Sequence, residues 1–299
     1  MNYKLPPLLL AAAFIGSSAF AAEKVERFFL DPVAQPERWS PAESTVQLDS
    51  VKFSGRPVLK WVAPIDHFAG EKKYPVGWPR MYFTRFYTPK PRLISNWSDW
   101  DFVEFDVKIK LENDSANKNC PITFIIASNA PTFNYSLKKL HDGKLHRIRI
   151  PVDRITNPAK IVRFGFSIAE SNYKHGAKLT VQAGNFHLSR SAECTVQQVK
   201  LLTPALTAAD TAVKLKLHVS GPANDVARGV PFELSGGPGK KVLRRETLPV
   251  QRGEKELEVV IDDLKLLPGR YTLTLFPGNK EKCKAVSFDL LSSPYKVKK

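Results

Sequence analysis

The sequence contains only three cysteines, Cys120, Cys194 and Cys283, among its 299 residues. They form neither a C-x-x-C pair nor a mixed Cys/His pattern with zinc-ligand spacing, so we expect no metal–thiolate site. Three thiols cannot all pair within one molecule, and their spacing does not choose among the three possible disulfides. The histidines are scattered singly, so we expect no metal site and no cofactor.

The sequence also lacks the motifs of common enzymes. It has no G-x-S-x-G elbow, no H-E-x-x-H helix and no glycine-rich phosphate loop. An alternating strand–helix pattern of the kind that builds a barrel enzyme is missing, and so is any motif for binding nucleic acid. We therefore expect a binding protein rather than an enzyme and assign no catalytic residue.

Long hydrophobic runs are confined to the N-terminus. Lys4 precedes an apolar run over residues 5–15, and the small residues that follow end in Ala19-Phe20-Ala21. This pattern predicts a secretory signal peptide over residues 1–21. Beyond it, no segment reaches the ~18 uninterrupted apolar residues of a transmembrane helix. We expect an exported protein, periplasmic, extracellular or at the cell surface of a bacterium, that does not span the membrane.

Acidic residues are fewer than basic ones, which gives a formal net charge of +16 at pH 7. The excess is spread over both halves of the chain and does not form a basic tail. A spread positive charge favours polyanionic surroundings, such as an acidic or sulfated glycan. The alternative is that the charge serves solubility alone.

Helical periodicity is hard to find, and short alternating or apolar runs recur instead. The run 102–110 is the clearest, because Val103, Phe105, Val107 and Ile109 point one way and polar residues the other. Such runs predict an all-β fold. In the first half we expect strands at 45–49, 57–62, 80–87, 102–110, 122–128, 145–151, 161–168 and 178–188. In the second half we expect them at 196–202, 212–220, 230–236, 241–250, 255–264, 270–276 and 284–291.

Segments of the first half resemble the jelly-roll modules of the galactose-binding-like type that accompany carbohydrate-active enzymes. The likeness lies in NWSDWDFVEFDVKI (96–109), HDGKLHRIRIPVDRI (141–155) and IVRFGFSIAESNYKHGAKLTVQAGNFHL (161–188). It implies a jelly-roll β-sandwich over 22–195 and a carbohydrate ligand. Many such modules have an Asp that supports a structural calcium where this chain has Gly184-Asn185, so we carry no calcium site over.

The second half resembles small immunoglobulin-like modules, chiefly through LPGRYTLTLF (267–276). In exported bacterial proteins such modules serve as spacers or docking units. The resemblance implies an immunoglobulin-like β-sandwich over 196–299 and a possible protein partner for it.

Two loops contain candidate ligand residues. The loop 64–80 presents Asp66, Trp78 and Arg80, and an aromatic ring with polar neighbours can cover the apolar face of a sugar. The turn ESNYKHG (170–176) adds Tyr173 and His175. Tyr82 and Tyr135 complete the predicted ligand-binding set. For each loop the alternative is a structural role, with Trp78 plugging the sandwich and Tyr173 capping it.

The sequence therefore predicts an exported, non-catalytic carbohydrate-binding protein whose ligand is a polysaccharide or cell-surface glycan. A first alternative is a polysaccharide lyase in which Tyr173 or His175 is the base and basic residues neutralise an acidic glycan. It requires both residues in an open groove. A second alternative is a structural or docking protein without a glycan ligand. The carbohydrate hypothesis requires Trp78 to be at least partly exposed.

Overall fold

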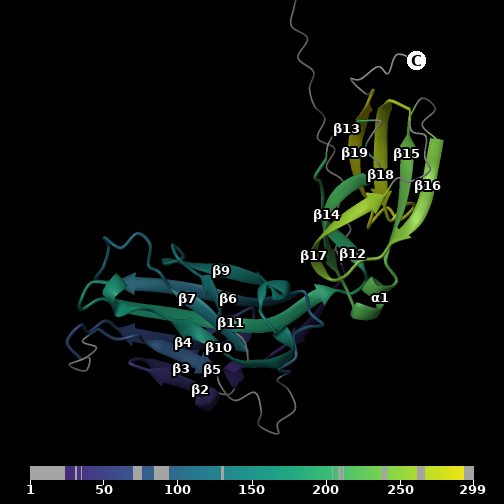
Figure 1. The fold of residues 1–299 in the computed structure, drawn as a ribbon. Coiled ribbons are helices and arrows are strands. Elements are labelled where there is room, and N and C mark those ends of the chain that lie inside the picture. The colour runs from purple at the N-terminus through teal and green to yellow at the C-terminus, as the bar shows by residue number, and fades with distance from the viewer. Residues whose placement is uncertain are drawn as a thin grey trace, which may run out of the picture.

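The computed structural model describes residues 24–30, 32–34, 36–69, 76–83, 94–128, 131–203, 205–207, 210, 212–237, 241–260 and 267–292. The predicted signal peptide, residues 84–87 of the strand expected at 80–87, residues 261–264 of the strand expected at 255–264 and residues 70–75 of the loop 64–80 lie outside these ranges. Nearly all regular structure is β, as predicted, and it forms two β-sandwiches that lie end to end (Figure 1). We call them the first and the second sandwich. No helix in the described ranges is long and apolar enough to cross a bilayer.

The first sandwich consists of two antiparallel sheets. The six-stranded sheet has the order β3 (Thr45–Phe53), β4 (Arg56–Pro64), β11 (Lys178–Ser191), β6 (Phe102–Glu112) and β9 (Asp142–Pro151), with β1 (Val25–Phe29) paired to the end of β11. The five-stranded sheet has the order β2 (Trp39–Ala42), β5 (Arg80–Phe83), β10 (Ile161–Ser167), β7 (Thr123–Ser128) and β8 (Phe133–Ser136).

The strand order of the first sandwich is that of a jelly roll. Numbered along the chain from β4 to β11, its eight central strands lie as 1-8-3-6 in one sheet and 2-7-4-5 in the other. The chain therefore crosses repeatedly between the sheets, as in two interlocked Greek keys. Short 3-10 turns lie between strands: η1 (Pro32–Ala34), η2 (Pro36–Arg38), η3 (Val152–Arg154), η4 (Pro158–Lys160) and η5 (Glu170–Asn172).

The core lies between the two sheets and is rich in aromatic side chains. Val103, Phe105, Val107 and Ile109 of β6 are buried, as their alternation predicts. The Phe105 ring lies 4.4 Å from that of Phe124 in the opposite sheet, centroid to centroid. Aromatic contacts of this kind pack the two sheets against each other.

The outer face of β6 departs from the expected wet surface. Lys108 and Lys110 are exposed, but Glu104 and Asp106 are buried. Their carboxylates are satisfied locally, because Ser189 Oγ donates to Glu104 at 2.5 Å and Asn185 Nδ2 donates to Asp106 at 2.6 Å. The outer face of the six-stranded sheet is thus buried near Glu104 and Asp106 and exposed to solvent near Lys108 and Lys110.

The second sandwich packs a three-stranded sheet, β12 (Thr195–Leu201), β14 (Ala212–Ser220) and β17 (Gly253–Val260), against a five-stranded one. The latter has the order β13 (Ala205–Thr207), β19 (Lys284–Leu291), β18 (Gly269–Leu275), β15 (Val230–Gly236) and β16 (Lys241–Leu248). One short helix, α1 (Ala223–Ala227), follows β14.

This strand order is compatible with the immunoglobulin-like sandwich that the sequence resemblance implies. Buried Tyr271 of β18 donates its hydroxyl hydrogen bond to the carbonyl of Leu267, four residues upstream. The position and the bond match the tyrosine corner of such folds.

Of the strands in the described ranges, β1, β2, β8 and β13 were not predicted. All four are short, and β2 contains Pro41, which cannot donate to a ladder and is typical of an edge strand. β1, β2 and β13 are additions at or near a sheet margin, whereas β8 is the fifth of the eight jelly-roll strands and was missed.

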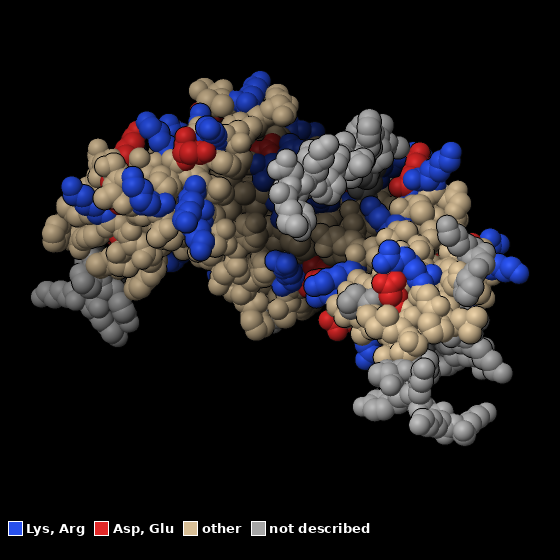
Figure 2. Space-filling model, turned by 90° about the horizontal axis from the view of Figure 1, so that it is seen from above, with Lys and Arg blue, Asp and Glu red and all other residues tan. Residues whose placement is uncertain are grey.

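Among the charged side chains at the surface, basic ones outnumber acidic ones. Figure 2 shows one face of the molecule, on which Lys and Arg are spread over both sandwiches and Asp and Glu are fewer. The spread agrees with the even distribution of charge along the sequence.

Candidate functional site

The loop that follows β4 is fixed at both ends by one buried carboxylate. Glu170 Oε1 accepts a hydrogen bond from the backbone N–H of Asp66 at 3.3 Å, and Oε2 accepts one from that of Gly77 at 2.9 Å. The Glu170 N–H donates in turn to the Gly77 carbonyl at 3.1 Å. Glu170 is only 4% exposed, so water competes little for these bonds. The backbone on either side of residues 70–75 is therefore held to the turn η5.

Aromatic and polar side chains gather on this support. The ring of Phe68 lies edge-on to that of His175, with centroids 4.6 Å apart, and Phe68 is 82% exposed. His175 Nδ1 accepts a hydrogen bond from the N–H of His67 at 3.2 Å and lies 3.7 Å from Asp66 Oδ1. The N–H of Phe68 donates to Asp66 Oδ1 at 3.0 Å, which closes a tight turn. We call Asp66, Phe68, His175 and Trp78 the loop edge.

Trp78 is included in the loop edge because it directly follows Gly77, whose N–H donates to Glu170. Its side chain is 49% exposed, which meets the requirement set by the carbohydrate hypothesis. Arg80 and Tyr82 follow in β5 and point to the outer face of the five-stranded sheet, opposite to buried Met81 and Phe83. There the guanidinium of Arg163 lies 5.0 Å from the centre of the Tyr82 ring.

Tyr173 is not at the surface, and this corrects the prediction. It is 4% exposed, and its hydroxyl donates to the carbonyl of Pro121 at 3.1 Å and lies 3.9 Å from Cys120 Sγ. Burial raises the pKa of this hydroxyl far above its ordinary value. A residue in this position cannot reach a substrate or act as a base, so the lyase alternative loses Tyr173.

Tyr135 also faces the protein interior. It lies in the edge strand β8 opposite Phe124 and packs, partly buried, against the core. The structure thus brings Asp66 and His175 together and holds the backbone next to Trp78 to the same carboxylate as that of Asp66. It places Arg80 and Tyr82 on an adjoining sheet face and separates the side chains of Tyr173 and Tyr135 from both. Phe68 was not predicted, although an apolar ring between charged and small loop residues was a usable signal.

The chemistry available at the loop edge is that of binding. Two exposed rings offer apolar faces, and a carboxylate, an imidazole and backbone groups offer hydrogen bonds beside them. Among the described residues, no group of three or more His, Cys, Asp and Glu side chains is arranged to hold a metal ion.

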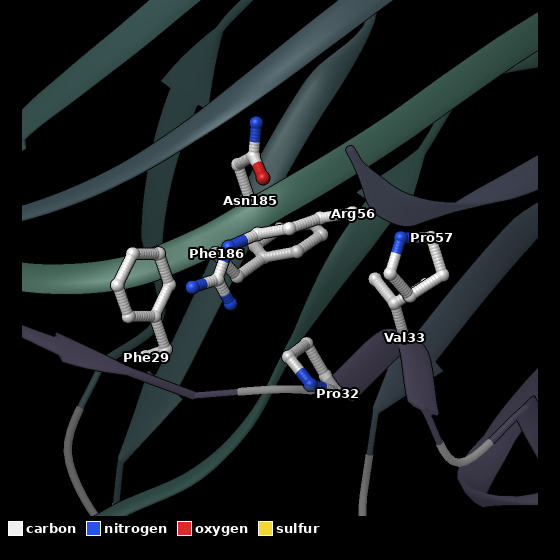
Figure 3. Close-up of a pocket in the computed structure, with 7 residues that line it drawn as sticks. All are labelled: Phe29, Pro32, Val33, Arg56, Pro57, Asn185 and Phe186. Carbon is white, nitrogen blue, oxygen red and sulfur yellow. The ribbon is translucent and has the colours of Figure 1, made fainter. Parts of the chain in front are cut away.

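A separate pocket at the other end of the six-stranded sheet is too small for a sugar. Phe29, Arg56, Asn185 and Phe186 line it, and the Arg56 guanidinium lies 3.5 Å from the centre of the Phe29 ring (Figure 3). Its volume of about 10 Å³ is close to that of one water molecule. We therefore exclude it as a carbohydrate site.

No protein-family model and no curated protein matches this chain. Among solved structures, it is similar to a CBM4 carbohydrate-binding module at 10% identity, covering 51% of this chain and 94% of that one, with a TM-score of 0.29. It is also similar to the adhesin domain of Epf from Streptococcus pyogenes at 9% identity, covering 85% and 81%, with a TM-score of 0.27.

A third similar structure is the M60 catalytic domain with two CBM51 domains of ZmpB from Clostridium perfringens. The identity is 11%, the coverage 89% of this chain and 23% of that one, and the TM-score 0.26. At these values none of the three bears on what this chain binds.

Proposed function

We propose that the protein is an exported, non-catalytic carbohydrate-binding protein that contacts its glycan through the loop edge. The observation that carries this proposal is the fixed exposure of aromatic rings. Phe68 and Trp78 flank a backbone that buried Glu170 holds at both ends. Exposed apolar surface that is grouped and not scattered marks interaction sites, and a fixed backbone lowers the entropy lost on binding.

In this proposal each residue has a defined part. The rings of Phe68 and Trp78 cover the apolar faces of sugar rings, and the carboxylate of Asp66 accepts hydrogen bonds from sugar hydroxyls. His175 positions Phe68 through their ring contact and adds a polar group beside it. Arg80 and Tyr82 extend the surface toward the five-stranded sheet. The second sandwich serves as a spacer or as a docking unit for a protein partner.

A glycan-array measurement with the purified protein and matched variants tests the proposal. We expect Phe68→Ser and Trp78→Ala each to weaken binding about tenfold or more, because stacked rings dominate such contacts. Tyr173→Phe is the control, since Tyr173 is buried away from the loop edge and should leave binding unchanged. Wild-type protein that binds no glycan on the array, or variants that bind as well as wild type, would overturn the assignment.

The same rings would also suit a protein partner, which is the second candidate function. Exposed aromatic side chains at a rigid edge are typical of protein interfaces as well. Capture of one defined protein by wild type but not by Trp78→Ala, together with a silent glycan array, would favour docking.

A further inference from the structure

The open end of the six-stranded sheet carries a groove on its outer face, away from the core. Its volume is about 650 Å³, within the range of ligand sites. Side chains from β4, β6 and β11 form its floor, and β9 and β3 flank it. The loop edge adjoins one end of the groove. At that end Lys178, the first residue of β11, pairs with Pro64 and Glu112, the last residues of β4 and β6, and the loop begins directly after Pro64.

The floor of the groove is basic. In the strand register Lys60 pairs with Gln182, and Gln182 pairs with Lys108, so an amide lies between two ammonium groups. The backbones of Lys60 and Lys108 are about 9.5 Å apart, which is two strand spacings. Neither lysine has an ion-pair partner within the described part of the chain. Lys60 acts electrostatically on Asp49 and Glu112 without forming an ion pair with either, so both ammonium groups can still pair with an anionic ligand.

Further along the groove, two more lysines share one carboxylate. Lys110 Nζ lies 2.5 Å and Lys178 Nζ 3.9 Å from oxygens of Glu112. Two positive charges against one negative leave an excess here too. Gln182 is held in place, because its Nε2 donates to Asp49 Oδ2 at 2.6 Å, so its carbonyl oxygen stays available as an acceptor.

No Phe, Tyr or Trp side chain is among the residues that line this groove, and His141 is the one lining residue with a ring. A neutral sugar bound by ring stacking would find no large aromatic platform here, and the bases of a single-stranded nucleic acid would find only one imidazole. Amides, a threonine hydroxyl and carboxylates instead suit a ligand that alternates anionic groups with hydroxyls. The carboxylates of Glu112 and Asp142 can accept hydrogen bonds from the hydroxyls of such a ligand.

We infer that this groove binds a segment of an acidic polysaccharide, through its carboxylate or sulfate groups, with Lys60 and Lys108 as the principal contacts. The inference rests on the proposed glycan-binding function for the nature of the ligand, but its residues are separate from the loop edge. The groove binds the anionic groups of the ligand, whereas the loop edge contacts the apolar faces of its sugar rings.

The test is binding of the purified protein to polygalacturonate, dextran sulfate and neutral dextran at two salt concentrations. We expect wild type to bind at least one of the acidic polymers, more weakly at high salt, and Lys60→Gln/Lys108→Gln to lose about tenfold or more. Lys200→Gln/Lys214→Gln is the matched control: it removes the same charge from exposed positions of the second sandwich and should change binding little. Thermal unfolding midpoints check that both variants are folded.

Three results would overturn the inference: no binding to either acidic polymer, equal losses in both double variants, or equally tight binding of a twenty-nucleotide oligothymidine. The last would assign the groove to nucleic acid. Trp78→Ala separates this inference from the proposed function. If the groove binds acidic polymers but the loop edge does not bind glycans, Trp78→Ala leaves binding to the acidic polymers unchanged, whereas Lys60→Gln/Lys108→Gln loses it.

Discussion

Arg252 of the second sandwich donates to Asp101 of the first, from Nε at 3.2 Å and from Nη2 at 3.1 Å, both to Oδ1. The other oxygen, Oδ2, accepts from the hydroxyl of Ser220 and from the N–H groups of Ser191 and Gly221. The Asp101 side chain is 4% exposed and that of Arg252 16%. A buried, fully hydrogen-bonded ion pair thus joins the two sandwiches.

This ion pair predicts that the contact between the two sandwiches contributes to the stability of the protein. Arg252→Gln leaves the Asp101 carboxylate buried without its counter-charge, and we expect a loss of about 2–3 kcal/mol in the free energy of unfolding. Chemical denaturation followed by circular dichroism measures it. Arg270→Gln is the control, because its partner Asp289 is a surface residue and the midpoint should not move. If Arg252→Gln and Arg270→Gln lowered the unfolding free energy equally, the Arg252–Asp101 pair would stabilise the protein no more than a surface ion pair does.

Asp101 also predicts a pH dependence. Burial raises the pKa of its carboxyl, and the hydrogen bond from Ser220 and the charge of Arg252 offset this only in part. The folded protein therefore binds this proton more tightly than the unfolded chain. Its contribution to stability is present at low pH and is lost as pH rises through the titration of the folded state.

Asp101→Asn removes that titration and so serves as the reference. We expect the unfolding free energy of wild type, minus that of Asp101→Asn, to decrease as pH rises from about 4 to 7. Denaturation at several pH values in one buffer series measures the difference. A difference that increases with pH would mean that the charged form of Asp101 is favoured by folding.

Glu170→Gln tests the support of the loop edge. A carboxylate accepts from both Asp66 and Gly77, but an amide offers one oxygen and turns its NH₂ group toward the other donor. We expect a loss of about 1–3 kcal/mol in stability and faster hydrogen exchange at Asp66 and Gly77. Exchange followed by mass spectrometry measures it, with exposed Glu281→Gln as the control. Unchanged exchange would show that the loop is held by other contacts.

The sequence predicted the fold well because local patterns encode it. The alternation along 102–110 identified the core face of β6, and the resemblance of segments 96–109, 141–155 and 161–188 to galactose-binding-like modules implied the jelly roll. In β5, Arg80 and Tyr82 alternate with buried Met81 and Phe83, and alternation of this kind needs no knowledge of a strand's partners.

The sites were predicted less well because they depend on contacts between distant residues. Tyr173 follows a strand in a polar turn, which is typical of a surface residue, but the chain at Pro121, 52 residues earlier, accepts its hydroxyl inside the core. The groove likewise exists only once β4, β11 and β6 are paired in the register that sets Lys60 and Lys108 on either side of Gln182. Asp101 and Arg252 are 151 residues apart, and no local pattern links them.

The cysteines give a final prediction about reactivity. All three thiols are free; Cys120 and Cys194 are buried and Cys283 is exposed. Burial raises the pKa of Cys120 to about 11, so at pH 8 only about one molecule in a thousand carries its thiolate, which is the reactive form. With iodoacetamide at pH 8 we expect Cys283 to react first and Cys120 hardly at all, and the Cys120 rate to rise about tenfold per pH unit while the protein stays folded. Peptide mass spectrometry identifies the labelled sites, and full labelling of all three in denaturant is the control. If Cys120 were labelled as fast as Cys283 in the native protein, the packing of Tyr173 over it would be wrong, and Tyr173 would again be available at the surface.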